Sequence, residues 1–256
     1  MKHDLIIRGG KLVTANETYT ADIGIKDGRI ATLGEDLDGN DIINADKKLV
    51  MPGGIEAHCH IAQESANGIM TSDDYETGSI SAAFGGNSCF VPFAAQKKGE
   101  SIASTIAEYD RRAETKSVID YSYHLILTDP NENVLNELPS AFERGITSFK
   151  VFMTYATRVS DAQFLDILTI ARRHGGLTMV HAENHDMLSW MSNALTQAGY
   201  TEPRYHAPAR PSLAEEEAIN RAISLSKLAN APLMIVHVST PKGAELVARA
   251  RMDGAF

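Results

Sequence analysis

The chain has 256 residues, of which 43% are hydrophobic and 22% charged, as in a globular protein with a substantial core. Its 33 acidic residues outnumber 24 basic ones, and the net charge of -9 argues against nucleic acid or an anionic membrane as main partner. No apolar run approaches the roughly 18 residues of a membrane span. Two cysteines, Cys59 and Cys89, are too few for a disulfide framework and predict a reducing, cytoplasmic environment.

The first 50 residues have the pattern of a small β-sheet domain. Short strands are expected at residues 4–8, 21–26 and 29–33, and Asp27-Gly28 between the last two is a strong signal for a tight hairpin. The sequence Met51-Pro52-Gly53-Gly54 then interrupts the pattern. We therefore expect a domain formed by residues 1–52 and a second one formed by residues 53–256.

The second domain alternates short apolar strands with amphipathic helices, which indicates βα units and a parallel sheet. No Gly-x-Gly-x-x-Gly turn follows a strand, so a (β/α) barrel is preferred to a dinucleotide-binding sheet. Six units are expected, two fewer than an eight-stranded barrel needs, so the barrel is expected to be incomplete. The strands are predicted at residues 55–61, 88–94, 121–128, 148–153, 177–181 and 233–238, and the helices around residues 74–84, 100–114, 160–174, 185–198, 212–229 and from about 241.

Four histidines occur at the ends of these strands. His58 and His60 are two residues apart on one strand, so their imidazoles point to the same face and can converge on one ion. His181 and His237 end two further strands. Because active sites of barrels lie at the carboxyl ends of the strands, and neutral imidazole is a good zinc ligand, these four residues are candidate metal ligands.

Lys150 lies inside the apolar strand SFKVFM, at residues 148–153. A buried ammonium must find a partner or lose its proton. Two interpretations follow: a salt bridge in the core, or a neutral amine that captures carbon dioxide as a carbamate and binds two metal ions.

The ordered motifs resemble the amidohydrolase superfamily, and within it the dihydropyrimidinase and hydantoinase group. They are PGGIEAHCH at residues 52–60, FGGN at 84–87, SFKVFMTY at 148–155, VHAEN at 180–184 and VHVS at 236–239. The resemblance implies an α/β fold, with the first six units of a (β/α)8 TIM-like barrel and an N-terminal β-sandwich segment. It also implies a chain shorter than its relatives at the C-terminus.

The resemblance further implies a binuclear centre, most simply with two Zn²⁺ ions. His58 and His60 would bind the more buried metal, carboxylated Lys150 would bridge the pair, and His181 with His237 would hold the other. Tyr155 would donate a hydrogen bond to the oxyanion. A metal-bridging hydroxide would then open cyclic amides or imides, such as dihydrouracil or 5-substituted hydantoins, to N-carbamoyl amino acids. A cytoplasmic homotetramer acting in pyrimidine catabolism is expected on the same ground.

Some features leave alternatives open. The family's aspartate ligand on the eighth strand has no counterpart here, so this chain alone is expected to be inactive and poorly folded. Ala62 stands where dihydroorotases carry arginine, which argues against that activity. Residues 61–65 are less apolar than the corresponding loop of many hydantoinases, which leaves the preferred substituent open. An allantoinase-like cyclic amidohydrolase and a non-catalytic scaffold with the same fold are the alternatives.

Overall fold

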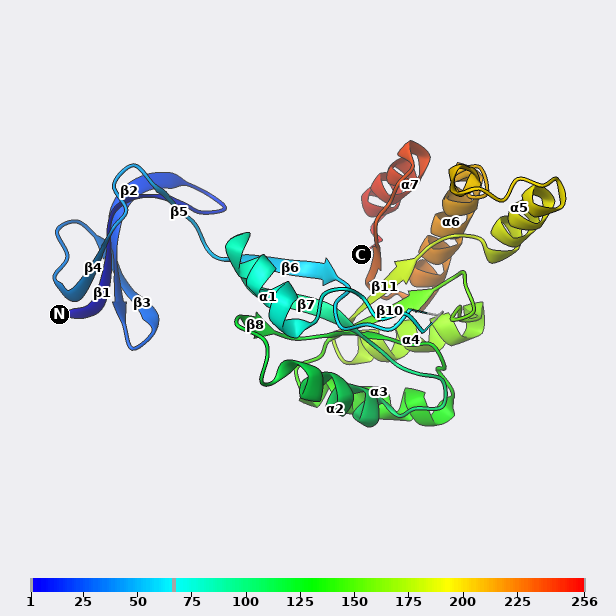
Figure 1. Ribbon diagram of the computed structural model, residues 1–256, viewed down its shortest axis with the longest axis horizontal. Coiled ribbons are helices and arrows are strands. Elements are labelled where there is room, and N and C mark those ends of the chain that lie inside the picture. Colours follow the sequence, from blue (N-terminus) through cyan, green and yellow to red (C-terminus); the bar gives the residue numbers. More distant parts are fainter. Residues whose placement is uncertain (1, 66–67, 256) are drawn as a thin grey trace. The chain divides into compact units, whose positions relative to one another are not determined.

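The computed structural model describes residues 2–65 and 68–255, and the chain divides into two compact units, Met1–Gly54 and Ile55–Phe256 (Figure 1). Each unit has a sheet of its own. The expected combination of an N-terminal sheet with a parallel α/β half-barrel is confirmed.

The first unit is a five-stranded mixed sheet with the order β3-β2-β1-β4, in which β5 also pairs with β1. Asp27 and Gly28 join β2 to β3 with positive φ angles of 51° and 70°, which suits the right-handed twist of a hairpin. The last two strands were not expected from the sequence. The strands are β1 (His3–Val13), β2 (Thr18–Lys26), β3 (Arg29–Gly34), β4 (Gly39–Asn44) and β5 (Leu49–Val50).

The second unit is built on a sheet with the order β12-β11-β10-β9-β7-β6, and the short β8 also pairs with β7. The pairs from β7 through β12 are parallel, as expected. The strand expected at residues 121–128 is divided into β8 and β9. The strands are β6 (Gly54–Cys59), β7 (Asn87–Ala95), β8 (Asp120–Tyr121), β9 (His124–Ile126), β10 (Ser148–Phe152), β11 (Leu177–His181) and β12 (Leu233–Ile235).

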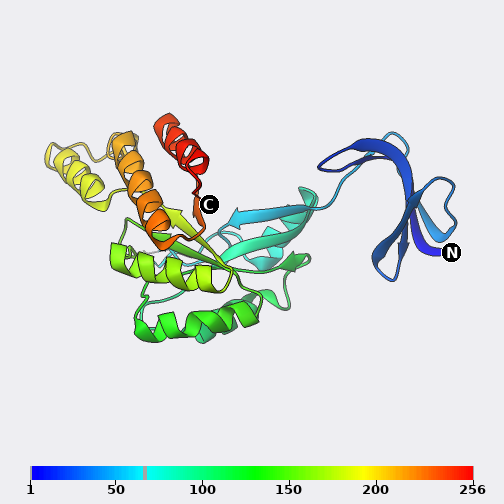
Figure 2. The same cartoon turned by 180° about the vertical axis from the view of Figure 1, so that it is seen from behind.

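A layer of helices covers one face of this sheet (Figures 1 and 2). Neighbouring helices pack in the order α1, α2, α3, α4, α6 and α7, so the layer follows the strands. In the part of the chain that is described, no helix combines the length and the apolar character needed to cross a membrane. The helices are α1 (Tyr75–Phe84), α2 (Ile102–Ala113), α3 (Glu132–Glu143), α4 (Asp161–Arg173), α5 (His185–Gln197), the 3-10 turn η1 (Pro203–Tyr205), α6 (Ser212–Ala229) and α7 (Pro241–Met252).

Helix α3 was not predicted from the sequence, and this omission was wrong. Pro139 lies inside it and removes one backbone hydrogen bond, which usually argues against a helix. Two compensating signals were present in the sequence. The side chain of Asn131 caps the N-terminus by accepting a hydrogen bond from the amide of Val134, and Val134, Leu138 and Ala141 form one buried stripe.

Side chains of the strands alternate between two apolar clusters. Phe149 and Val151 on β10 belong to the large core between the sheet and the helices. Phe152 faces the opposite way, toward a smaller cluster around Phe93, and the ammonium of Lys150 lies against both of these rings. Alternation along β10 therefore delivers Lys150 to the face of the sheet that lies away from the helix layer.

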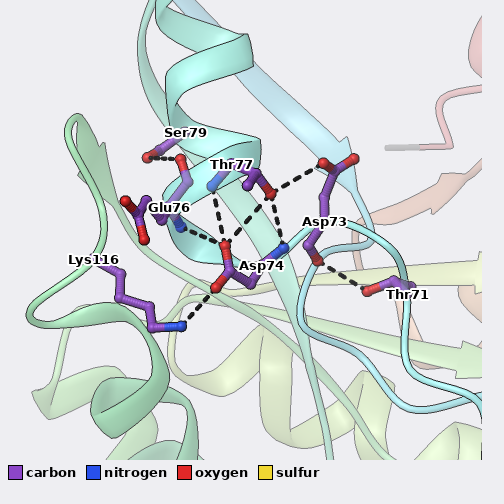
Figure 3. A network of polar contacts seen from close by, with 7 residues as sticks. All are labelled: Thr71, Asp73, Asp74, Glu76, Thr77, Ser79 and Lys116. Atoms are coloured by element: carbon purple, nitrogen blue, oxygen red, sulfur yellow. Dashed lines mark hydrogen bonds and ion pairs between the residues drawn. The ribbon is translucent and has the colours of Figure 1, made fainter.

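Helix α1 begins at a network of polar contacts (Figure 3). The carboxylate of Asp74 accepts hydrogen bonds from the amides of Glu76 and Thr77, both at 3.0 Å, and the Thr77 hydroxyl accepts one from the Asp74 amide. The ammonium of Lys116 adds an ion pair at 2.6 Å. The Lys116 hydrogen bond, followed by the Thr77 amide, lowers the pKa of Asp74 to about 2.

Candidate active site

The four strand-end histidines lie in one cluster. The His58 ring is 5.6 Å from the His60 ring and 5.8 Å from the His237 ring, and His237 lies 4.6 Å from His181, measured between ring centroids. His58 is on β6 and His237 follows β12, the two strands that end the order of the sheet. Strands at opposite edges can bring their side chains so close only if the sheet curls. The half-barrel is therefore what assembles the cluster.

Lys150 lies deep in the same region. It is 1% exposed, and its Nζ atom is 5.0 Å from the ring centroid of Phe93 and 4.8 Å from that of Phe152. Burial lowers its pKa to about 8. Among the described residues, no carboxylate forms an ion pair with this amine. The salt bridge in the core, one of the two interpretations of the sequence, therefore has no partner here.

Three imidazoles of the cluster, those of His58, His60 and His237, are neutral at physiological pH. Burial, and then the charge of Lys150, lower the pKa of His58 to about 4. Burial also lowers the pKa values of His60 and His237. Neutral imidazole is the form that binds metal.

The four imidazole rings do not have the arrangement of ligands around a metal ion. His60 stacks on Phe93 at 4.6 Å, and its Nδ1 atom lies 2.6 Å from the side-chain oxygen of Gln63. Across residues 2–65 and 68–255, no three His, Cys, Asp or Glu side chains form a group that could hold a metal ion. The five proposed ligands are brought together, and the metal centre stays a prediction.

Tyr155 lies beside the cluster, three residues beyond β10. Its ring is 5.2 Å from the His181 ring, and 39% of the residue is exposed. Its φ angle is 67°, and that of His237 is 40°, both in the left-handed region that side chains other than glycine rarely adopt. Backbone strain of this kind concentrates at functional sites.

Two residues near Tyr155 were missed by the sequence reasoning. Glu183 lies 2.6 Å from Nε2 of His181, and the same carboxylate oxygen accepts a hydrogen bond of 2.5 Å from Arg210. The guanidinium carbon of Arg210 is 5.3 Å from the ring centroid of Tyr155. Glu183 belongs to the VHAEN motif, which could have drawn attention to it, whereas Arg210 carried no such signal.

A fifth histidine, His124 at the start of β9, is held by the protein itself. Its Nδ1 atom contacts the Ser148 hydroxyl at 2.5 Å, and its Nε2 atom contacts the carbonyl oxygen of Ala57 at 3.0 Å. Because both nitrogens have partners in the protein, His124 is not among the candidate ligands.

A cavity of about 860 Å³ opens beside Tyr155 and Phe152. Gln63, Gln96 and an ion pair between Lys97 and Glu64, 3.1 Å apart, line part of its wall. Phe152 connects the cavity with the cluster, because its ring also lies 5.5 Å from that of His181. The cavity can hold a small molecule with polar groups close to Tyr155.

Comparison with known proteins identifies relatives along nearly the whole chain. It is 41% identical to a D-hydantoinase from Geobacillus stearothermophilus over 254 residues, which cover 97% of this chain and 54% of that protein. It is 34% identical to a dihydropyrimidinase from Rattus norvegicus over 260 residues, which cover 98% of this chain and 50% of that protein. No protein-family model matches.

The fold is similar to that of the same group of proteins. It matches the crystal structure of a dihydropyrimidinase from Brevibacillus agri NCHU1002 with a TM-score of 0.94 at 42% identity, over 100% of this chain and 56% of that one. The resemblance indicated by the motifs is therefore confirmed. The chain spans about half the length of the curated relatives that it matches.

Proposed function

From the similarity of nearly the whole chain to D-hydantoinases and dihydropyrimidinases, we propose that this protein is a metal-dependent cyclic amidohydrolase. Its substrates are dihydropyrimidines such as dihydrouracil, or 5-substituted hydantoins. Water adds across one ring amide: its oxygen bonds to the carbonyl carbon, the carbon–nitrogen bond breaks, and the nitrogen takes up a proton. The product is an N-carbamoyl amino acid.

The observation that carries the proposal is the convergence of His58, His237 and His181 beside a buried lysine amine with no carboxylate partner among the described residues. Imidazole in its neutral form is a good ligand for zinc. A desolvated amine that loses its proton near pH 8 is able to add to carbon dioxide, and the resulting carbamate would supply the missing negative charge. The donor set thus fits two divalent ions.

In this proposal His58 and His60 would hold one ion, His181 and His237 would hold the other, and carboxylated Lys150 would be a ligand of both. Two such ions, when bound, lower the pKa of a water molecule and polarise the substrate carbonyl. Tyr155 donates a hydrogen bond to the oxygen that gains charge during the attack. The left-handed backbone at Tyr155 and its ring contact with His181 hold the phenol near that position.

The cavity beside Tyr155 would receive the substituent of the ring. Its wall carries both signs of charge, in Lys97 and Glu64, together with the amides of Gln63 and Gln96. Apolar side chains, among them Ile126 and Phe152, line the rest of the wall, so the cavity can accept a substituent with both polar and apolar parts.

Metal content, measured on a protein of the same length as the relatives and purified without chelators, tests the proposal. The expected value is about two ions per chain, with loss in a Lys150→Ala variant. His206→Gln is a matched control, because His206 is exposed at the end of η1 and outside the cluster. Folded wild-type protein without bound metal would contradict the proposal and favour a non-catalytic scaffold.

Relative rates on dihydrouracil, hydantoin and allantoin then identify the ring. Faster turnover of allantoin than of the other two would replace the proposed activity with an allantoinase-like one. A cytoplasmic homotetramer is part of the same proposal, and light scattering checks its oligomeric state. Zinc as the bound metal is also part of it, and elemental analysis checks the metal.

A further inference from the structure

One carboxylate oxygen joins two parts of the candidate site. Oε2 of Glu183 lies 2.6 Å from Nε2 of His181 and 2.5 Å from a guanidinium nitrogen of Arg210. Glu183 follows strand β11 by two residues, and Arg210 immediately precedes Pro211, the N-cap of α6. The three side chains are shielded, with 17% exposure for Glu183, 14% for His181 and 27% for Arg210. Two segments far apart in sequence are thereby fixed to each other.

The contact with Glu183 selects one nitrogen of His181. A carboxylate can only accept, so Nε2 of His181 carries the proton and donates it to Glu183. The lone pair of the imidazole is then on Nδ1, which is the nitrogen left to bind an ion. The guanidinium of Arg210, a permanent cation, lies on the same carboxylate oxygen, so Glu183 accepts hydrogen bonds from both partners.

Arg210 extends the connection to Tyr155. Its guanidinium carbon is 5.3 Å from the Tyr155 ring centroid, a cation–π distance, and the same ring contacts His181 at 5.2 Å. Tyr155 has no regular secondary structure to hold it, and its backbone is in the left-handed region. Arg210, anchored by Glu183, supplies a fixed surface against which the phenol ring rests.

We propose that Glu183 and Arg210 are positioning residues: Glu183 fixes the tautomer and orientation of the metal ligand His181, and Arg210 holds Tyr155. This inference rests on the proposed function, because it assigns His181 to the metal and Tyr155 to the substrate. Carboxylates that accept from a ligating histidine commonly govern how tightly the metal is held. The pair thus couples metal affinity to the placement of Tyr155.

Glu183→Gln keeps the shape of the side chain and removes its charge. We expect this variant to bind Zn²⁺ about 10- to 100-fold more weakly, measured by competition with a chelating dye. The visible spectrum of the Co²⁺-loaded protein should change as well, since the ligand field at His181 changes. Glu217→Gln is the control: Glu217 also pairs with an arginine, Arg221, and with Asn184, and is partly buried with 34% exposure, but it does not contact a proposed ligand.

The variant Arg210→Met tests the role of Arg210 in holding Tyr155 separately from the role of Glu183 at His181. We expect kcat to fall roughly tenfold to a hundredfold while KM changes little, because Tyr155 acts on the transition state. Arg210→Lys should not restore the rate, since an ammonium cannot cover the ring as a planar guanidinium does. Circular dichroism of each variant verifies the fold.

The outcomes separate the two proposals. If wild-type protein binds zinc and opens rings, and folded Glu183→Gln binds zinc as tightly with an unchanged Co²⁺ spectrum, this inference is overturned and the proposed function stands. If wild-type protein binds no divalent ion, the proposed function fails and the inference fails with it. A loss of affinity equal to that of Glu217→Gln would also contradict it, because a carboxylate without contact to His181 would then have the same effect.

Discussion

Replacing Lys150 with methionine should stabilise the metal-free protein while it abolishes metal binding. Lys150 is 1% exposed and lies between the rings of Phe93 and Phe152, where methionine can be accommodated without a charge. The lysine amine, by contrast, leaves water without gaining a carboxylate partner among the described residues. Its presence therefore costs stability that only a function explains.

The pKa of Lys150 sets the size of the effect. Burial lowers it from 10.5 to about 8, and at 1.36 kcal/mol for each pKa unit the charged amine costs about 3 kcal/mol on folding. The two ring contacts of the ammonium return about 0.5–1 kcal/mol each. The variant Lys150→Met should therefore gain about 1–2 kcal/mol at pH 7. Because the pKa of the amine is lower in the folded state than in the unfolded state, the charged amine destabilises the folded protein. This destabilisation is complete below pH 8 and disappears as the pH rises to 10.5.

Urea unfolding of chelator-treated protein measures this difference, at pH 7 and again near pH 10.5, where the gain should be lost. Lys116→Met is the control, because Lys116 is exposed and paired with Asp74, so its replacement should not stabilise the protein. A Lys150→Met variant that is less stable than the wild type at pH 7 would refute the reasoning. It would mean that the amine has a favourable partner.

Two further predictions concern the network in Figure 3 and the phenol beside the cluster. Asp74→Ala should lower the free energy of unfolding by about 1 kcal/mol through loss of the N-cap of α1. Because the pKa of Asp74 is lowered to about 2, this contribution is complete above pH 4 and is lost as the pH falls to 2, so melting curves of the two proteins should converge in acid. Tyr155→Phe should reduce kcat about a hundredfold with unchanged metal content, since the ring contacts remain and only the hydroxyl is lost. If wild-type protein and Tyr155→Phe have the same kcat, the hydroxyl of Tyr155 has no part in the mechanism.

Much of the local structure follows from the sequence pattern. The hairpin at Asp27-Gly28 is present because few residue pairs adopt two consecutive positive φ angles easily. The parallel strands form where continuous apolar runs alternate with amphipathic helices, and alternation along β10 places Lys150 on the opposite face from Phe149 and Val151. Helix α3 shows the limit of such local rules, because packing of one apolar stripe outweighs the hydrogen bond lost at Pro139.

The sequence by itself determined which residues are the candidates for the chemistry: His58 and His60 on one strand, a lysine within an apolar strand, and histidines at two further strand ends. Only the tertiary structure decided that they meet. The curl of the sheet brings His58 and His237 to 5.8 Å although they end strands at opposite edges. The tertiary structure also brings Arg210, in the segment before α6, to Glu183. Periodicity reports the direction of a side chain from its own strand, whereas curvature and long-range pairing arise from the packing of many elements together, which no local pattern contains.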